Sequence, residues 1–298
     1  MQFWQPLTFS ETDQLVDAAR FAEEVGFTGV MIPDHLFFAP KETTPYAGTP
    51  DGTLPVTYGG DFPDCWVTLA TLAARTTSLK IMSAACILPL HNPIEVAKAA
   101  GAVTIFSNNR LLVGIGVGWK KDEFDVLGVD FHTRGRRADE WIDVLRLVWS
   151  GKPFKHHGPF FKLDAEPILP APIKLPPIIV CGSSARALKR AACLADGWHN
   201  EANTLEELDP ILGNLGRMRE EAGRNHIPFE IIVTLCAEPG NLGSAFEPKL
   251  EDLTRLEKMG VTALSRHPFP STLGRPSTLD QKKRSMERFA ESIIRYKS

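Results

Sequence analysis

Three groups of residues in this chain could take part in chemistry, and each follows a run of β-branched and aliphatic residues. The run from Leu111 to Ile115 leads into three glycines spaced two apart, Gly114, Gly116 and Gly118. Alternate glycines remove the side chains from one face of a strand end, so a flat ring or a phosphate can lie against the backbone. A dinucleotide fingerprint needs a different spacing, G-x-G-x-x-G before a long helix. The pattern predicts a ligand site, with close packing against a neighbouring strand as the alternative.

The second group is Cys181-Gly182-Ser183-Ser184, directly before a helical segment that begins Ala185-Arg186. Glycine and two hydroxyls at a strand-to-helix turn are typical of an anion site, because free N–H groups and the positive end of the helix dipole meet there. A serine in this position can also act as an ordinary N-cap. We expect the turn to bind a phosphate ester, with Arg186 nearby.

The third group is Asp34-His35, at the end of a candidate strand. A histidine there could donate a proton or bind a ring carbonyl, and Asp34 could orient the imidazole or cap the loop. A purely structural histidine is the alternative. The sequence offers neither a nucleophile elbow nor an isolated pair of carboxylates. It therefore favours a cofactor site over a protein nucleophile.

Composition narrows the class of protein. The chain has 298 residues and a net charge of -3, with scattered Lys and Arg, so nucleic acid and anionic membranes are not expected partners. The N-terminus lacks a signal-peptide pattern, and no segment reaches about 18 uninterrupted apolar residues. We therefore expect a protein that acts on a small molecule. The five cysteines are dispersed, which indicates a cytoplasmic protein, and they lack metal-ligand spacing, so no metal site is expected. They are Cys65, Cys86, Cys181, Cys193 and Cys236.

Alternating strands and helices must position these residues. The candidate strands are Gln2–Leu7, Gly29–Pro33, Leu79–Leu88, Leu111–Gly116, Pro177–Cys181, Gly197–Asn200, Glu230–Ala237 and Val261–Ser265. The helical segments are Glu11–Val25, Asp64–Arg75, Pro93–Phe106, Arg136–Trp149, Ala185–Ala195, Leu205–Gly223, Lys249–Met259 and Leu279–Tyr296. The pattern predicts one (β/α)8 barrel domain over residues 1–298, with a doubly wound open sheet as the alternative.

Local signals mark several helix ends and one long insertion. Helix caps are expected at Ser10 with Asp13 and at Thr204 with Glu207, and helix ends at Gly26 and Gly260. In a barrel, the residues that follow each strand gather at one end, where active sites lie. The insertion after the second strand is expected to form a lid there, with a structural cap or a dimer contact as alternatives. Its aromatic residues are Phe37, Phe38, Tyr46, Tyr58 and Phe62.

In these motifs the chain resembles the bacterial luciferase-like superfamily, and within it the oxidoreductases that use the deazaflavin coenzyme F420. The matching motifs occur in order between about Ala18 and Trp198: Pro33-Asp-His35, Leu88-Pro-Leu-His-Asn-Pro93, Ser107 to Trp119, Phe131-His-Thr-Arg-Gly135, Asp139-Glu140, Cys181-Gly-Ser183 and Ala195-Asp-Gly-Trp198. The resemblance implies a (β/α)8 barrel that binds a flavin or deazaflavin at the carboxyl ends of its strands, with extended loops there.

The resemblance also implies roles for single residues. Asp34 and His35 would be the catalytic residues. A non-prolyl cis peptide bond would lie behind the ring, between Ala85 and Cys86. The cofactor would be bound by Ala85, Cys86, Gly116, Val117, Gly118, Cys181, Gly182, Ser183 and Ser184. Three positions depart from the pattern: Asn109 replaces a usual glycine, and Cys181-Gly182 replaces the common Gly-Gly of the phosphate turn. Trp119 replaces an acidic residue of the sugar-phosphate dehydrogenases, which argues against that substrate.

The implied function is transfer of a hydride between the deazaflavin C5 and an enone, imine, aldehyde or alcohol. The alternative is a monooxygenase that uses reduced FMN from a separate reductase, and a further alternative is a non-catalytic flavin-binding protein. Exposed cations near the site would favour F420, whose tail is anionic; the candidates are Lys120, Lys121 and Arg186. A homodimer is expected, with contacts through the helices after the second and third strands.

Overall fold

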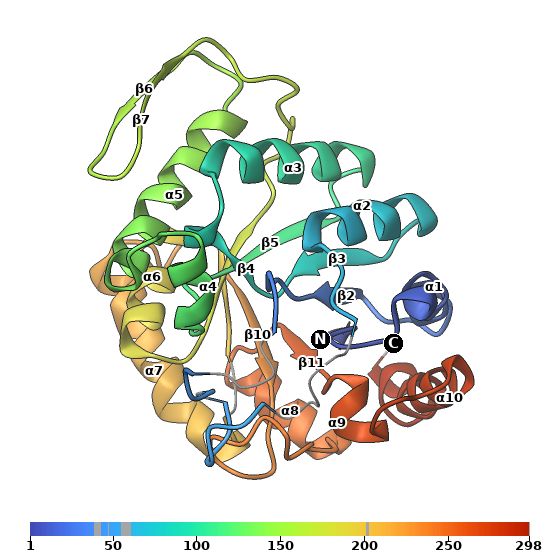
Figure 1. The fold of residues 1–298 in the computed structure, drawn as a ribbon. Helices are drawn as coiled ribbons and strands as arrows, with labels where there is room; N and C mark the ends of the chain where they lie inside the picture. Colours follow the sequence, from blue (N-terminus) through green and yellow to red (C-terminus); the bar gives the residue numbers. More distant parts are fainter. Residues whose placement is uncertain (39–42, 47, 55–60, 201–202, 298) are drawn as a thin grey trace.

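The chain forms a closed ring of parallel strands surrounded by helices (Figure 1). The structure is a computed structural model and describes residues 1–298 except 39–42, 47, 55–60, 201–202 and 298. Neighbouring strands follow the order β3-β2-β1-β11-β10-β9-β8-β5-β4, and pairing of β3 with β5 closes the ring. The predicted (β/α)8 barrel is confirmed.

Each barrel strand coincides, within a few residues, with a strand expected from the sequence. In the described part of the chain the barrel strands are β1 (Gln2–Pro6), β2 (Gly29–Ile32), β3 (Lys80–Ser83) with β4 (Cys86–Ile87), β5 (Leu111–Gly116), β8 (Ile178–Cys181), β9 (Gly197–His199), β10 (Glu230–Thr234) and β11 (Ala263–Ser265). The third expected strand is divided into β3 and β4, and both pieces pair with β5.

Helices cover the outside of the barrel. They are α1 (Leu15–Glu24), α2 (Cys65–Arg75), α3 (Pro93–Phe106), α4 (Lys121–Val126), α5 (Arg134–Trp149), α6 (Ala185–Leu194), α7 (Leu205–Glu221), α8 (Leu250–Lys258), α9 (Phe269–Leu273), α10 (Leu279–Phe289) and α11 (Arg295–Lys297). A π-helical segment, Ala290–Ile294, joins α10 to α11. The sequence did not predict α4, α9 or the hairpin of β6 (Phe154–His157) and β7 (Lys162–Ala165), which projects from the barrel beside α5 (Figure 1).

The expected helix ends are largely observed. Thr204 and Glu207 form a capping box at α7, and Gly26 and Gly260 adopt the left-handed conformation at φ 95° and 86°. The expected cap at Ser10 is wrong. Its hydroxyl is buried and has no hydrogen-bond partner in the described residues, because a 3₁₀ turn at Thr12–Gln14 separates it from α1.

The barrel interior contains a layer of large side chains and, closer to the carboxyl ends of the strands, a layer of smaller ones. The filled layer contains Trp4, Met31, Met82, Leu112, Ile179, Ile232 and Ala263. Two residues further along five of these strands, the same face carries smaller or more polar side chains, because strand side chains alternate between faces. These residues are Ala84, Gly114, Cys181, Thr234 and Ser265. The carboxyl ends of the strands therefore present a floor of small side chains.

A buried cation joins the start of the chain to α10. The Lys282 side chain is fully buried and its Nζ binds Glu11 Oε2, Gln14 Oε1 at 2.8 Å and the Ser277 carbonyl at 2.8 Å. Strand β1 pairs with β11 on one side and β2 on the other.

Among the described residues, no helix has the length and apolar character needed to cross a membrane.

Candidate active site

His35 lies directly after β2, where a buried carboxylate holds its imidazole. His35 Nδ1 is 3.0 Å from Glu123 Oε2, and Glu123 Oε1 accepts the backbone N–H of Leu36 at 2.6 Å. The Glu123 side chain is fully buried, whereas the His35 side chain is 15% exposed. No described residue forms a hydrogen bond with His35 Nε2. That nitrogen is therefore available to a ligand.

Aromatic rings surround the His35 imidazole. The ring centroids of Phe38, Phe62 and Trp119 lie 5.0, 5.6 and 5.9 Å from the imidazole centroid. Phe38 and Phe62 belong to the insertion after β2, contact each other and both contact Phe9. These rings give His35 apolar surroundings that limit its contact with water.

Other residues of the insertion pack against the segment that follows β5. The ring of Tyr46 contacts Trp119 at a centroid distance of 5.0 Å. Lys120 is fully buried, and its Nζ binds the Phe37 carbonyl and lies 4.5 Å from the Phe37 ring. The expectation that Lys120 is an exposed cation is wrong, because the insertion covers it. Tyr58 lies outside the described residues.

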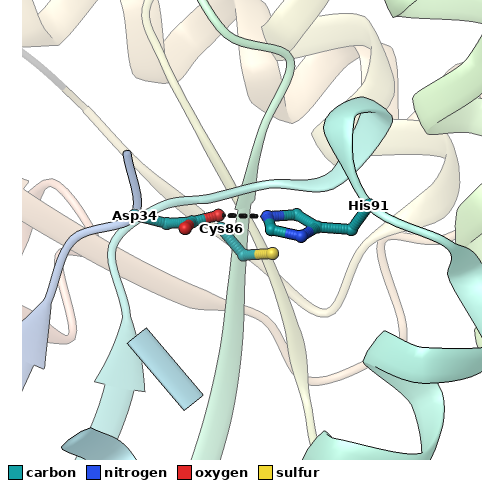
Figure 2. Close-up of side chains that lie close together, drawn as sticks. All are labelled: Asp34, Cys86 and His91. Atoms are coloured by element: carbon teal, nitrogen blue, oxygen red, sulfur yellow. Dashed lines mark hydrogen bonds and ion pairs between the residues drawn. The ribbon is translucent and has the colours of Figure 1, made fainter. Parts of the chain in front are cut away.

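Asp34 has a different set of partners (Figure 2). Its Oδ2 lies 2.6 Å from His91 Nε2 and accepts the backbone N–H of Ile87 at 2.9 Å. Cys86 lies beside this pair, and the possible ligand atoms of the three side chains are within 4.8 Å of one another. Asp34 therefore connects the end of β2 to the turn after β4, and its hydrogen bonds do not orient His35.

Burial and charge act in opposite directions on this cluster. Burial raises the pKa of Asp34, but the hydrogen bond and charge of His91 outweigh burial and hold that pKa below its ordinary value. Burial lowers the pKa of His91, and Asp34 more than reverses this effect. Burial, with the Asp34 charge, raises the pKa of the Cys86 thiol well above its ordinary value. The cluster is thus a hydrogen-bonded carboxylate–imidazole pair beside a thiol that burial keeps protonated.

Two of the three alternate glycines are required for packing. A Cβ on Gly114 would lie 1.9 Å from the Ser83 carbonyl oxygen, because β3 and β5 approach closely there. Gly118 has a φ of 82°, and a Cβ on it would lie 2.7 Å from Ile87 and 2.9 Å from Phe124. At these two positions close packing by itself requires glycine.

Gly116 is different, because a Cβ there would approach only Ala85, at 3.2 Å. Gly116, Val117 and Ala85 are all partly exposed. The cis peptide bond lies between Ala84 and Ala85, one residue before the expected position. The expected position is wrong because Cys86 already belongs to β4 and is paired with β5, so the break in the strand must precede it. The bare backbone at this end of the barrel is therefore formed by Gly116 and the Ala84–Ala85 peptide.

The turn after β8 has the form of an anion site. Cys181 ends β8 and is buried, and Gly182 adopts a φ of 117°. The Ser183 hydroxyl donates to Asn203 Oδ1 at 2.9 Å, while Ser184 is the N-cap of α6 and accepts a backbone N–H of its first turn at 3.2 Å. The N-cap alternative therefore holds for Ser184. The other N–H groups in the first turn of an α-helix have no partner within the helix.

Two guanidinium groups lie near this turn. Arg186 is exposed in the first turn of α6. Burial lowers the pKa of Arg134, and the positive charge of Arg186 lowers it further. Arg134 is fixed by hydrogen bonds to the carbonyls of Gly118, at 3.2 Å, and Phe131, at 2.8 Å. Two like charges therefore lie near the N-terminus of α6, the positive end of its helix dipole.

Sequence reasoning missed Glu123 and His91 as partners of the two candidate catalytic residues. His91 lies within the Leu88–Pro93 motif, but its contact with Asp34 spans 57 positions of the sequence. Glu123 lies 88 positions from His35. A glutamate next to Phe124 in a short charged segment gives no sign in the sequence that it faces inward.

The match to known families agrees with this geometry. Residues 4–243 match the model of the luciferase-like monooxygenase family. The chain belongs to this family and is an oxidoreductase of the luciferase-like class, which includes F420-dependent and FMN-dependent enzymes.

Similar proteins include both cofactor types. An uncharacterized protein of Mycobacterium tuberculosis is 35% identical over 282 residues, 94% of each chain. The FMNH(2)-dependent dimethylsulfone monooxygenase of Pseudomonas fluorescens is 32% identical over 179 residues, which are 58% of this chain and 48% of that protein. The F420-dependent hydroxymycolic acid dehydrogenase of M. tuberculosis is 28% identical over 218 residues, 72% of this chain and 56% of that one.

Solved structures share the fold at low sequence identity. The monooxygenase RslO1 from Streptomyces bottropensis superposes with a TM-score of 0.77 at 20% identity over all of both chains. An F420-dependent secondary alcohol dehydrogenase, solved with an F420-acetone adduct, gives 0.74 at 18% identity over 98% of both chains. These likenesses support the barrel assignment.

Proposed function

We propose that this protein is an F420-dependent oxidoreductase that reduces or oxidises a small carbonyl, imine or alcohol compound. The observation that carries the proposal is the His35–Glu123 pair, which presents a free imidazole nitrogen among aromatic rings at the carboxyl end of the barrel. Such a group can transfer the proton that must accompany a hydride. The F420-dependent dehydrogenase among the relatives supports the choice of cofactor.

The residues at this end of the barrel fit a deazaflavin. Gly116 and the Ala84–Ala85 peptide offer a surface without large side chains, suited to a flat ring. The turn from Cys181 to Ser184 would bind a phosphate through the free N–H groups of α6. Arg186, with Arg134 beside it, would bind further negative charge of the cofactor tail. Val117 and Gly118 complete the loop beside the ring position, and the expected contact from Cys86 would be made by its backbone because its side chain is buried.

The chain's own residues then have separate tasks. When bound, the deazaflavin supplies a carbon that donates or accepts a hydride. His35 Nε2 gives a proton to the substrate oxygen or nitrogen during reduction, or takes one during oxidation. Phe38, Phe62 and Trp119 exclude water from this nitrogen. Asp34 keeps the end of β2 in place through His91.

A monooxygenase using reduced FMN is the second candidate, because the dimethylsulfone enzyme is 32% identical in the matched region. It would require a separate reductase to supply the reduced flavin. A non-catalytic flavin-binding protein would have no need for a buried glutamate behind His35, so the pair argues against that alternative.

The first experiment is a fluorescence titration of the purified protein with F420 and with FMN, each in oxidised and reduced form. Binding of F420 alone at micromolar or lower concentration would support the proposal, and turnover of small enones and alcohols would then be screened. Selective binding of reduced FMN would replace the proposal with the monooxygenase. Binding of neither cofactor would contradict both.

The assembly and location of the protein are also proposed. We propose a cytoplasmic homodimer that contacts its partner copy through α2 and α3, where Val67 and Phe106 are 67% and 73% exposed. Size-exclusion chromatography with light scattering tests the dimer, and Val67→Glu with Phe106→Glu should give monomers. A monomeric wild-type protein would overturn this assignment.

A further inference from the structure

Glu123 lies on α4, a short helix that the sequence did not predict, and both of its carboxylate oxygens are used. One accepts the Leu36 backbone N–H at 2.6 Å, and the other faces His35 Nδ1 at 3.0 Å. The side chain is fully buried, so water does not replace either partner. The carboxylate therefore forms hydrogen bonds with two consecutive residues, His35 and Leu36, in the segment that follows β2.

This geometry selects one form of the imidazole. A carboxylate only accepts hydrogen bonds, so His35 Nδ1 must carry the hydrogen that points to Glu123. In neutral imidazole the other nitrogen, Nε2, then has a free lone pair. Nε2 is also the nitrogen for which the described residues provide no partner.

We propose that Glu123 is a positioning residue that holds His35 as its Nδ1–H tautomer and so makes Nε2 the proton-transferring atom. The part of this proposal that concerns proton transfer rests on the proposed oxidoreductase function. The tautomer assignment rests only on the contacts of His35 and Glu123.

The other charged groups near His35 are engaged elsewhere. Asp34 is paired with His91 at 2.6 Å. Lys120 Nζ is directed to the Phe37 carbonyl and lies 4.6 Å from the Phe38 ring centroid. Among the described residues, Glu123 is thus the group that forms a hydrogen bond with the His35 ring.

Glu123→Gln provides a sharp test because it changes one oxygen to an NH2 group without changing size. The Leu36 N–H is a fixed donor, so the glutamine oxygen must pair with it and the NH2 group must face His35 Nδ1. An NH2 group needs an acceptor, so Nδ1 should lose its hydrogen and Nε2 should gain one. Long-range proton–nitrogen NMR of ¹⁵N-histidine-labelled protein reads the tautomer directly, and a His35→Asn spectrum assigns the signals.

A matched control is available outside the barrel mouth. Glu140 is also a buried glutamate, which pairs with His156 Nε2 at 3.0 Å and accepts the Phe161 N–H at 2.8 Å. Glu140→Gln should alter the His156 signals and leave the His35 tautomer unchanged. It reports the general effect of removing a buried carboxylate.

The wild-type spectrum should show His35 protonated at Nδ1, and the Glu123→Gln spectrum should show it protonated at Nε2. Turnover is followed as oxidation of reduced F420 by cyclohex-2-en-1-one. In this direction His35 must carry hydrogens on both ring nitrogens, so that Nδ1–H donates to the Glu123 carboxylate while the Nε2 proton is given to the substrate. The NH2 group of Glu123→Gln cannot accept from Nδ1–H, so kcat should fall about 100-fold or more, with F420 affinity and KM retained. Glu140→Gln should retain kcat.

A neutral wild-type His35 that carries its single ring hydrogen on Nε2 would overturn the proposal, even if the variant does not fold. An unchanged tautomer or an unchanged kcat in Glu123→Gln would also overturn it. Failure of the proposed function is distinguishable, because the wild type would then oxidise no reduced F420 while the NMR result on the tautomer would still stand.

Discussion

Asp34 and His35 are adjacent in the chain, yet their side chains are held by different elements. Asp34 Oδ2 lies 2.6 Å from His91 Nε2, in the turn after β4, whereas His35 Nδ1 lies 3.0 Å from Glu123 Oε2, on α4. Both residues lie beyond Ile32, the last residue of β2, in a segment whose side chains face different elements. This separation is the basis for proposing proton transfer for His35 and support of the backbone beneath it for Asp34.

Replacement of His35 should separate catalysis from binding. In His35→Asn we expect kcat to fall about 100- to 10,000-fold, because the proton donor or acceptor is lost, while F420 affinity is retained. His157→Asn, at a side chain that is 63% exposed on the hairpin, is the control and should have normal kcat. Stopped-flow and steady-state kinetics measure the change. Full activity of His35→Asn would remove its catalytic role.

Arg186 should contribute to cofactor binding but not to folding. Arg186→Ala should weaken F420 binding about tenfold, equivalent to about 1.4 kcal/mol for a charge-assisted contact. Its removal also relieves repulsion of Arg134, so Tm should be unchanged or slightly higher. Lys189→Ala, an exposed cation on the same helix, should bind F420 normally. An equal loss of affinity in both variants would indicate only a general charge effect.

The glycines of β5 should respond differently to a methyl group. Gly114→Ala should destabilise the protein by about 3 kcal/mol or more, since the Cβ would overlap the Ser83 carbonyl at 1.9 Å. Gly116→Ala should cost about 1 kcal/mol, because the Ala85 methyl has to move only slightly from 3.2 Å. Urea unfolding compares the two. Gly116→Ala should nevertheless weaken F420 binding, and normal affinity in this variant would place the ring elsewhere.

The Asp34–His91 pair should give stability that depends on pH. The folded-state pKa of His91 lies above its ordinary value of 6.5, so the pair stabilises fully below pH 6.5 and its effect declines as pH rises through the folded-state pKa. The pKa of Asp34 lies below its ordinary value of 3.8, so the effect is also lost on acidification below that pH.

The free energy of unfolding of the wild type and of His91→Asn should therefore differ most between pH 4 and 6.5. The difference should shrink by pH 9. A difference that is constant across this range would show that the pair makes no pH-linked contribution.

The sequence located the barrel because strands and helices leave periodic patterns, and these patterns survive in a single chain. Leu111–Gly116 and Pro93–Phe106 agree with the structure at both ends. The short helix Lys121–Val126 has too few turns to show a period, so it was missed together with Glu123. The division of the third strand at Ala84 and Ala85 depends on backbone geometry that residue types do not report.

From the sequence, only those residues of the candidate site that lie at the ends of predicted strands could be identified. His35, Gly116 and the turn after β8 follow strands and could be named. Gly114 and Gly116 differ in how close a Cβ would come to neighbouring atoms, 1.9 Å for Gly114 and 3.2 Å for Gly116. This distance depends on the tertiary structure and cannot be inferred from the residue types. The partners Glu123 and His91 are set by tertiary contacts across 88 and 57 positions.

The buried Lys282 also affects how the chain can fold during synthesis. Glu11 and Gln14 cannot bind Lys282 until it has been translated, because it follows them in the chain by 271 and 268 positions. One edge of β1 likewise stays unpaired until β11 has left the ribosome. The nascent chain therefore carries an open sheet edge through most of its translation, and the barrel closes only after nearly the whole chain has been made.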